Sequence, residues 1–354
     1  MDVAGPGGTV AVRPGEDIDR PRVLAYLREQ IPGLPGGDLA VWQYPSGASN
    51  LTYLLRVGAW EGVLRRPPRG PLPPRAHDMV REAGLLRRIH AVYPLAPNPY
   101  AICADPGVLG VPFYVMERRH GVVLDDHFPP GVAPTPERCR RIAESVVETL
   151  VRLHAVDWQA AGLADLGRPE GFVARQVRGW IGRYDAAKTD DLPQVAPLVR
   201  WFEAHLPASG APAIVHNDFK LNNLLLAAPD LAPVVAVLDW EMTTIGDPLF
   251  DLGVSLGYWI EPGDPPGFRT LLPTVTYFPG FISRAEFMAR YAALSGRDLA
   301  DIEYYLTFAY FKLAVILQQI YARWQRGLTS DPRFATFGEA VRMLIEHAHD
   351  RAFG

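Results

Sequence analysis

The sequence predicts an α+β protein of two lobes, a small β-rich N-terminal lobe and a larger, mainly helical C-terminal lobe. Short strand-like runs bounded by Gly and Pro come first along the chain, and long runs with helical spacing follow. The length of 354 residues is enough for two such lobes. We expect residues 1–117 to form the N-terminal lobe and residues 118–354 to form the C-terminal lobe.

The N-terminal lobe begins with a Gly/Pro-rich stretch, residues 1–15, that we expect to be a disordered tail. A helix is predicted over residues 18–31, where apolar residues recur at helical spacing. Residues 51–57 and 62–65 are typical of a hairpin pair around a four-residue turn. The remaining expected elements are a Pro-rich loop over 67–74, a helix over 78–89 and a strand over 113–117.

Helical spacing dominates the C-terminal lobe. Between the helices, residues 213–251 alternate strands with loops, and Asp247 before Pro248 predicts a helix N-cap. Helices are expected over 136–155, 171–183, 195–206, 285–295, 301–326 and 333–351, with irregular connections over 261–267 and 270–280.

Composition limits the kinds of partner and compartment. A net charge of −4 argues against a nucleic-acid or anionic-membrane partner, and no apolar run reaches the length of a membrane span. Only two cysteines occur, Cys103 and Cys139, without the spacing of a zinc site or a disulfide framework. We therefore expect a soluble cytoplasmic protein with no nucleic-acid partner and no membrane association. The sequence carries no signal for its oligomeric state.

Chemistry-bearing residues concentrate in residues 216–223 and at the end of the strand-like run that finishes at Asp239. Asn223 follows Asp218 by five residues, and Asp239 lies sixteen residues beyond Asn223. Phosphoryl transfer requires a carboxylate that orients the attacking hydroxyl, and oxygen ligands that hold Mg²⁺ against the nucleotide phosphates. Asp218 suits the first role, and Asn223 with Asp239 suits the second. A tight turn explains Asp218 or Asn223 singly, but it does not explain the ordered set.

Besides that motif, five further segments carry a resemblance to a known family; they are residues 49–53, 63–68, 113–118, 238–241 and 246–248. With them, the chain resembles the aminoglycoside phosphotransferase/choline kinase-like superfamily, which has the bilobal protein-kinase architecture. Within the superfamily it resembles the subgroup related to the kinase-like domain fused to some acyl-CoA dehydrogenases. The resemblance runs with motifs from about Trp42 to Asp251 and more loosely to the C-terminus.

The resemblance implies a basic side chain on a small-lobe strand that binds the nucleotide phosphates, held by a Glu on the following helix. Arg65 stands at that strand position and Glu82 at that helix position. Arg66 is the competing assignment, because a register shift of one residue exchanges the two faces of a strand. The alternative is that neither residue has a functional role, and that they are simply an exposed arginine at a strand end and a glutamate on a helix surface.

Two other nucleotide contacts rest on position alone. The phosphate-covering loop falls at residues 44–50, where Ser46, Ser49 and backbone amides can contact phosphate, although the loop has one Gly only. Glu117 and Arg118 fall at the junction of the lobes, where backbone groups of the kinase fold bind the adenine edge.

Other residues are expected to support the site. Lys220 matches a lysine that many protein kinases place against the transferred phosphoryl group, with an exposed loop lysine as the alternative. His216 is expected to prop the loop backbone, and His154 to be a buried packing residue. Glu241 can support the metal site or a second ion. Asp251 can accept hydrogen bonds from the catalytic loop, with direct substrate contact as the alternative.

The sequence therefore predicts an enzyme that uses Mg²⁺ and ATP, with GTP as the alternative, to phosphorylate a hydroxyl on a small molecule. The subgroup suggests a hydroxyacyl chain or its CoA thioester as acceptor. An aminoglycoside or other antibiotic is the second choice, and a nucleotide-binding pseudokinase that regulates a partner is a third reading. The aromatic residues that can line the acceptor pocket, or else belong to the core, are Trp180, Tyr184, Tyr258, Trp259, Tyr304 and Tyr310.

Overall fold

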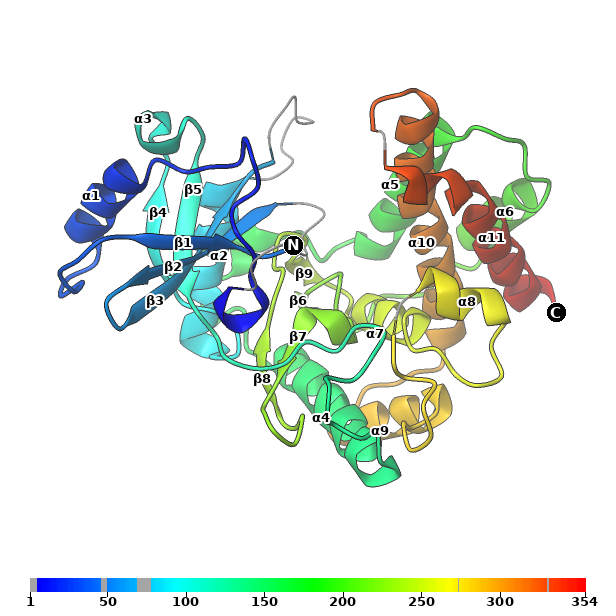
Figure 1. Cartoon of the computed structure of the whole chain (residues 1–354). Helices are drawn as coiled ribbons and strands as arrows, with labels where there is room; N and C mark the ends of the chain where they lie inside the picture. Colours follow the sequence, from blue (N-terminus) through cyan, green and yellow to red (C-terminus); the bar gives the residue numbers. More distant parts are fainter. Residues whose placement is uncertain (1–4, 46–49, 69–77, 273, 330) are drawn as a thin grey trace. The chain divides into compact units, whose positions relative to one another are not determined.

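The computed structural model describes residues 5–45, 50–68, 78–272, 274–329 and 331–354. The chain divides into two compact units. One comprises Met1–His120 with Val235–Glu241, and the other comprises Gly121–Val234 with Met242–Gly354. The first unit holds the large sheet and the second is mainly helical (Figure 1), so the expected α+β class is confirmed.

The first unit is built on a five-stranded antiparallel sheet of order β1-β2-β3-β5-β4. Its elements are β1 (Ala40–Gln43), β2 (Leu51–Val57), β3 (Trp60–Arg66), β4 (Pro99–Cys103), β5 (Phe113–Glu117), α1 (Arg20–Gln30), α2 (Met79–Val92), the short α3 (Pro106–Leu109) and a 3₁₀ turn, η1 (Pro6–Gly8). The turn between β2 and β3 is shorter than expected, because Val57 already pairs with Trp60. Gly58 enters it with φ 55°, a conformation that glycine adopts without steric cost.

The two faces of this sheet contact different helices. Tyr53, Leu64 and Val115 share one hydrophobic core with Leu27 of α1. Side chains alternate along a strand, so the residue after Leu64 in β3 points to the opposite face, where α2 lies. The alternation therefore directs Arg65 toward α2.

The segment before α1 is ordered where the structure describes it. The Val10 amide donates to the Gln43 carbonyl at 2.8 Å, and the Gln43 amide returns a bond to Val10 at 2.9 Å. The expectation of a disordered tail is therefore wrong for residues 5–15. An isolated bridge to a strand edge leaves no periodic pattern in the sequence, which explains the error.

Six helices of the second unit lie close to their expected ranges. They are α4 (Pro136–His154), α5 (Phe172–Ala187), α6 (Val195–Ala204), α9 (Arg284–Ser295), α10 (Ile302–Gln325) and α11 (Phe337–Phe353), with 3₁₀ turns η2 (Ala164–Leu166), η3 (Leu221–Asn223) and η4 (Pro332–Thr336). Helical ranges were not predicted for α7 (Pro248–Gly257) and α8 (Pro266–Leu271). Short strands β6 (Ala213–Val215), β7 (Leu224–Leu226) and β9 (Thr244–Gly246) accompany them, and β8 (Val234–Val237) leads into Asp239. α8 occupies part of a region expected to be irregular.

Helix α7 is fixed against α10 by its N-cap and by close packing. Asp247 accepts a bond from the Leu249 amide at 2.9 Å, which confirms the predicted cap, and another from the Tyr305 hydroxyl of α10 at 2.8 Å. A Cβ added at Gly253 would lie 2.7 Å from the Tyr305 carbonyl oxygen, so the two helices approach at a position without a side chain. This packing sets where the residues of α7 stand.

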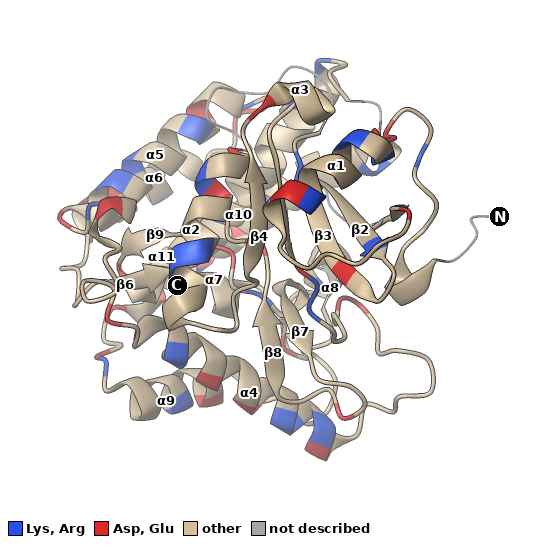
Figure 2. Cartoon of the chain, turned by 90° about the vertical axis from the view of Figure 1, so that its left-hand side faces the viewer, with Lys and Arg blue, Asp and Glu red and all other residues tan. Residues whose placement is uncertain are grey.

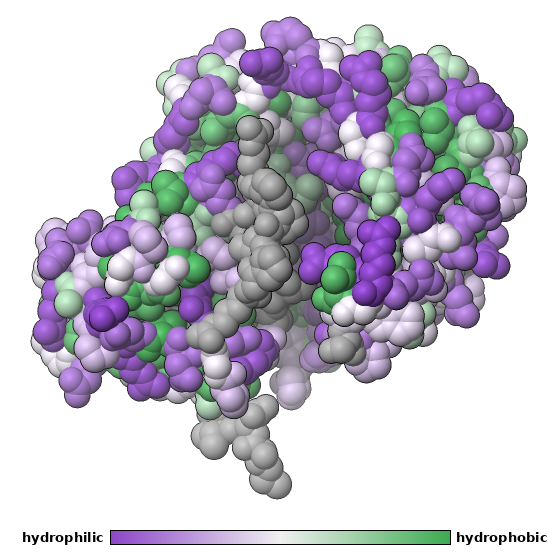
Figure 3. All heavy atoms as spheres, turned by 90° about the horizontal axis from the view of Figure 1, so that it is seen from above, coloured by the Kyte–Doolittle hydropathy of each residue, from purple (hydrophilic) through white to green (hydrophobic). Residues whose placement is uncertain are grey.

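The surface is mixed in charge and polarity. Figure 2 shows acidic and basic residues interspersed along α4, α5 and α9, as expected for a net charge of −4. Hydrophilic residues predominate on the face in Figure 3, and hydrophobic ones appear in small groups between them. Within the described chain, none of the helices combines the length and the apolar composition needed to cross a bilayer.

Candidate active site

Asp218 lies in the loop between β6 and η3, and its carboxylate is held by two neighbours from the same loop. The Asn223 side-chain amide donates to Oδ2 of Asp218 at 2.8 Å and to its backbone carbonyl, also at 2.8 Å. Lys220 Nζ lies 3.2 Å from the same Oδ2. The structure therefore brings together three of the residues that the sequence singled out.

The backbone before Asp218 is held in an uncommon conformation. Asn217 has φ 66°, in the left-handed region that Asn tolerates better than most residues. Asp251 of α7 accepts hydrogen bonds from the amides of His216 and Asn217, the second at 2.5 Å. Ser255 Oγ, one turn further along α7, donates to the Phe219 carbonyl at 2.8 Å. The expectation that Asp251 accepts hydrogen bonds from the backbone of this loop is confirmed.

A buried chain of polar groups stands behind Asp251. His154 Nε2 lies 3.3 Å from its carboxylate, and His154 Nδ1 lies 2.7 Å from the Tyr291 hydroxyl. Burial lowers the pKa of His154, so the neutral imidazole donates to Asp251 and accepts from Tyr291. Burial alone would raise the pKa of Asp251, but hydrogen bonds from His154 and the His216 amide hold that pKa below its ordinary value. His154 is therefore a hydrogen-bonding residue as well as a packing residue.

His216 also supports the loop directly. Its Nδ1 accepts a bond from the Asp218 amide at 3.3 Å, and its ring is fully buried. An acceptor Nδ1 inside the loop suits the structural role expected of His216.

In the first unit, Arg65 is the buried centre of an ion-pair cluster. Its Nη1 lies 2.8 Å from Glu82 of α2, and its Nη2 lies 3.2 Å from Asp239. Arg66 points to the other face of the sheet, where it donates to the Tyr53 hydroxyl at 3.0 Å and to the Glu16 carbonyl at 3.1 Å. Of the two arginines, Arg65 is the one that the structure brings to Glu82 and Asp239.

The carboxylates around Arg65 outnumber the cation. Burial first, and then the charges of Asp239 and Glu82, raise the pKa of Glu241 to about 7, and Asn50 donates to that carboxylate at 3.1 Å. Asp239 itself has φ 65°, so this predicted site residue lies in the left-handed region, as Asn217 does. An excess of carboxylate at this place is the environment that a bound divalent cation relieves.

The oxygen donors present fit Mg²⁺ better than a transition metal. Among the described residues there is no group of three or more His, Cys, Asp or Glu side chains placed to hold an ion. Mg²⁺ needs less, since it keeps several waters and uses one or two protein oxygens beside the substrate phosphates. The Asp239 carboxylate of the first unit is a donor of that type, and so, within the second unit, is the amide oxygen of Asn223.

The remaining predicted nucleotide contacts divide into two groups. Ser46 and Ser49 lie outside the described residues. The side chains of Glu117 and Arg118 are engaged within the first unit, where Glu117 lies 2.9 Å from Arg119 and Arg118 forms an ion pair with Glu61. Their assignment to the adenine site stays a prediction based on position.

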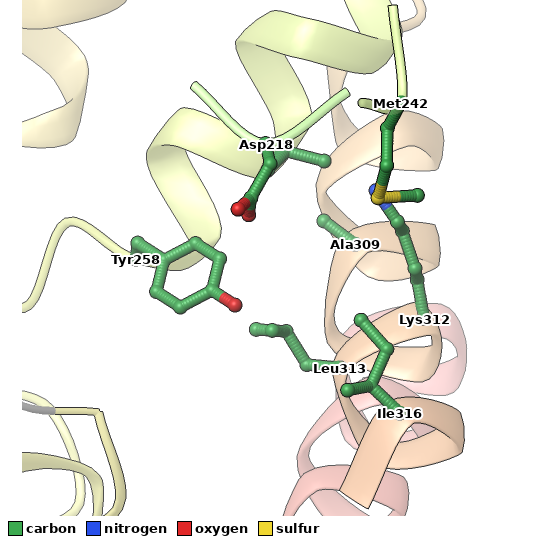
Figure 4. Close-up of a pocket in the computed structure, with 8 residues that line it drawn as sticks. Asp218, Met242, Tyr258, Ala309, Lys312, Leu313 and Ile316 are labelled. Atoms are coloured by element: carbon green, nitrogen blue, oxygen red, sulfur yellow. The ribbon is translucent and has the colours of Figure 1, made fainter. Parts of the chain in front are cut away.

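A small pocket opens beside Asp218 in the second unit (Figure 4). Figure 4 shows the carboxylate of Asp218 and the ring of Tyr258 facing a space bounded by α10. Its volume is about 20 Å³, enough for one small group such as a hydroxyl. The other residues that line it are Met242, Val254, Ala309, Lys312, Leu313 and Ile316.

Of the six aromatic residues proposed for this pocket, one lines it and five belong to the core. Tyr258 lines it, and Lys220 Nζ lies 4.8 Å from the centre of the Tyr258 ring. The other five, Trp180, Tyr184, Trp259, Tyr304 and Tyr310, are buried members of the core. Sequence reasoning missed Lys312, whose only signal was a charge in an otherwise apolar stretch of helix.

The fold and this set of residues define the class of kinase-like phosphotransferases. The model of the phosphotransferase enzyme family matches residues 41–301, and the chain belongs to this family. The predicted fold and the resemblance to the aminoglycoside phosphotransferase/choline kinase-like superfamily are thereby confirmed.

Similar proteins agree with that assignment. Over 351 residues the chain is 34% identical to acyl-CoA dehydrogenase family member 11 of Gallus gallus, a match that covers 96% of this chain and 44% of the relative. The chain thus spans less than half of that relative's length. A crystal structure from Ralstonia eutropha, solved as a candidate aminoglycoside phosphotransferase, is 30% identical with a TM-score of 0.79, covering 95% and 98% of the two chains. A choline kinase from Cryptosporidium parvum shares the fold at 13% identity, with a TM-score of 0.65 and coverage of 94% and 95%.

Substitution of Asp251 by Asn tests whether its charge holds the loop. At pH 7 the free energy of unfolding of the variant should be about 3 kcal/mol lower than that of wild type. The reason is that one of the two buried backbone amides then faces the NH₂ group of the new side chain and loses its acceptor. The folded pKa of Asp251 is depressed, so its contribution is fully present above the unfolded value near 4 and lost as pH falls below it. Denaturant unfolding should show the difference from wild type at pH 7 and its narrowing below about pH 4.

Asp185→Asn, which makes the same chemical change on the exposed face of α5, is the control. Equal stability of the Asp251→Asn variant and wild type at pH 7 would contradict the anchoring role.

Proposed function

We propose that the protein is a Mg²⁺-dependent small-molecule kinase that transfers the γ-phosphoryl group of ATP to a substrate hydroxyl. GTP is the alternative donor. The observation that carries the proposal is the Asp218 carboxylate, which Asn223 and Lys220 hold at the edge of a pocket that admits one small group. That arrangement suits a base that orients an incoming hydroxyl.

The other residues take roles consistent with this reaction. Arg65, kept in place by Glu82, binds the nucleotide phosphates, and its fork of donors suits two phosphate oxygens. Asp239 and Asn223 are the proposed ligands of Mg²⁺, which when bound offsets the negative charge of the phosphates. Lys220 places a positive charge beside the carboxylate of Asp218, where it can balance charge that develops on the transferred group.

The composition of the pocket favours a hydroxyacyl acceptor, free or as its CoA thioester. Most of its walls are apolar, and its charged groups are Asp218 and Lys312. The pocket admits only the reacting group, and its apolar walls suit an aliphatic carbon beside that hydroxyl, whereas a polycationic aminoglycoside needs an excess of acidic groups that these residues do not provide. The names of the acyl-CoA dehydrogenase relatives support the same acceptor class.

A panel of acceptors tests the proposal. Purified protein is incubated with Mg²⁺ and either ATP or GTP, together with hydroxy acids, hydroxyacyl-CoAs or aminoglycosides. We expect mass spectrometry to find phosphate added to members of the hydroxyacyl group. Phosphorylation of aminoglycosides alone would replace the acceptor class, and nucleotide binding without product across the panel would favour a regulatory pseudokinase.

Asp218→Asn separates the chemical step from nucleotide binding. Loss of the base should lower kcat by about 10³-fold, because general-base catalysis typically accelerates a reaction by a factor of that order. The dissociation constant for Mg·ATP should stay within about twofold, since the change is isosteric and remote in role from phosphate binding. Calorimetric titration alongside steady-state kinetics makes the comparison, and full activity in the variant would remove Asp218 from the mechanism.

Asp239→Asn tests the metal site without disturbing the backbone. Asn adopts φ near 65° readily, so the variant keeps the backbone turn while it removes the charge of the proposed ligand and its ion pair with Arg65. Affinity for Mg·ATP should fall by at least about tenfold, the scale at which metal-site substitutions act. Unchanged affinity across a Mg²⁺ titration would show that the metal has been assigned to the wrong residue.

A further inference from the structure

Lys312 is a buried cation at the pocket that none of the proposed steps yet uses. It lies in the middle of α10, with 5% of its surface exposed, between the apolar residues Phe311 and Leu313. Its Nζ donates to the carbonyl of Asn217 at 2.6 Å. That carbonyl belongs to the left-handed residue directly before Asp218.

The bond from Lys312 completes a three-sided hold on Asn217. The backbone amide of Asn217 donates to Asp251, its side-chain amide donates to the Met242 carbonyl at 2.9 Å, and its own carbonyl accepts from Lys312. A residue in a sparsely populated backbone region persists only where its surroundings over-determine it. Because Asp218 follows immediately, any change in the orientation of the Asn217 peptide changes the direction of the Asp218 carboxylate.

A lysine at this place is costly to the fold. Burial is the main cause that lowers the pKa of Lys312 to about 8, although Asp218 and Asp251 oppose it. The other cations that face it are Lys220 of the catalytic loop and Arg183 of α5, and the Trp180 ring centre lies 5.5 Å from Nζ. A methionine of similar length would fill the same space without the charge, so packing alone does not explain the lysine.

We propose that Lys312 is a positioning residue of the phosphoryl-transfer site, whose ammonium group holds the Asn217 carbonyl and so aims the Asp218 carboxylate into the pocket. The kinetic part of this inference rests on the proposed function. The structural part, that Lys312 immobilises the loop that carries Asp218, does not depend on any activity.

Three variants on α10 test the inference. Lys312→Met removes the charge and the donor at nearly constant volume, and Lys312→Arg keeps a charge that does not titrate. Gln318→Met is the matched control, because Gln318 is another buried residue of α10 that donates to a backbone carbonyl, Ala187 at 2.9 Å, away from the catalytic loop.

Hydrogen exchange gives the activity-independent result. In Lys312→Met the backbone amides of residues 214–224 should exchange about tenfold faster than in wild type, as expected when a charged hydrogen bond is lost. Gln318→Met should leave that segment unchanged. Exchange of the segment at the wild-type rate in Lys312→Met, or equal acceleration in the control, would overturn the proposal.

The role in catalysis is tested by measuring kcat, KM and the pH dependence of kcat with the acceptor identified in the panel. Lys312→Met should lower kcat by about tenfold or more with KM for ATP nearly unchanged, since misdirected groups lose rate rather than binding. Wild-type kcat should fall as pH rises through about 8, because Lys312 then loses its proton. Lys312→Arg should recover part of the lost kcat and show no such decline.

A decline near pH 8 that persists in both Lys312 variants would refute the positioning role in catalysis. If wild type phosphorylates no acceptor, the proposed function fails, and the exchange experiment alone decides whether Lys312 holds the loop.

Discussion

The loop of the second unit depends on one buried carboxylate that accepts two consecutive backbone amides. Asp251 is inaccessible to solvent, so its charge is tolerated only because donors from His154, His216 and Asn217 surround it. The same bonds give the loop amides partners that no strand or helix provides. Helix α7 is in turn fixed by the Asp247 cap and by its glycine contact with α10. The packing of α7 against α10 therefore determines the position of Asp218, the predicted base.

The first unit gathers several carboxylates around one cation. Arg65 is shared by Glu82 and Asp239, and Glu241 stands close enough for its pKa to respond to both carboxylates. In the second unit two lysines accompany the Asp218 carboxylate, one in the loop and one on α10. Each unit thus gathers charged side chains near a left-handed residue. Asn217 and Asp239 are two of the three non-glycine residues with positive φ in the described chain. Backbone strain and clustered charges of this kind concentrate at functional sites.

Sequence patterns predicted what is local and periodic. The strand Phe113–Glu117 and the helices α4 and α10 follow from runs of apolar residues at regular spacing, and the spacing of Asp218 and Asn223 predicted that they belong to one functional set. The face of β3 that carries Arg65 was left open, because alternation alone does not say which face meets α2. Contacts between residues distant along the chain could not be predicted in this way. No pattern in the sequence around Lys312 indicates that its side chain bonds to a loop 95 residues earlier. Aromatic residues misled for a related reason, since helical spacing is the same for a pocket wall and for a core.

The backbone conformation of Asp239 has a consequence for how such a chain can diverge. At φ 65°, aspartate, asparagine and glycine fit without much steric cost, whereas alanine and the branched side chains strain the turn. Descendants that give up catalysis but keep their fold should therefore carry asparagine or glycine at this place more often than alanine. In family members that have lost activity, the few residue types found at this position would therefore reflect the backbone conformation of the turn.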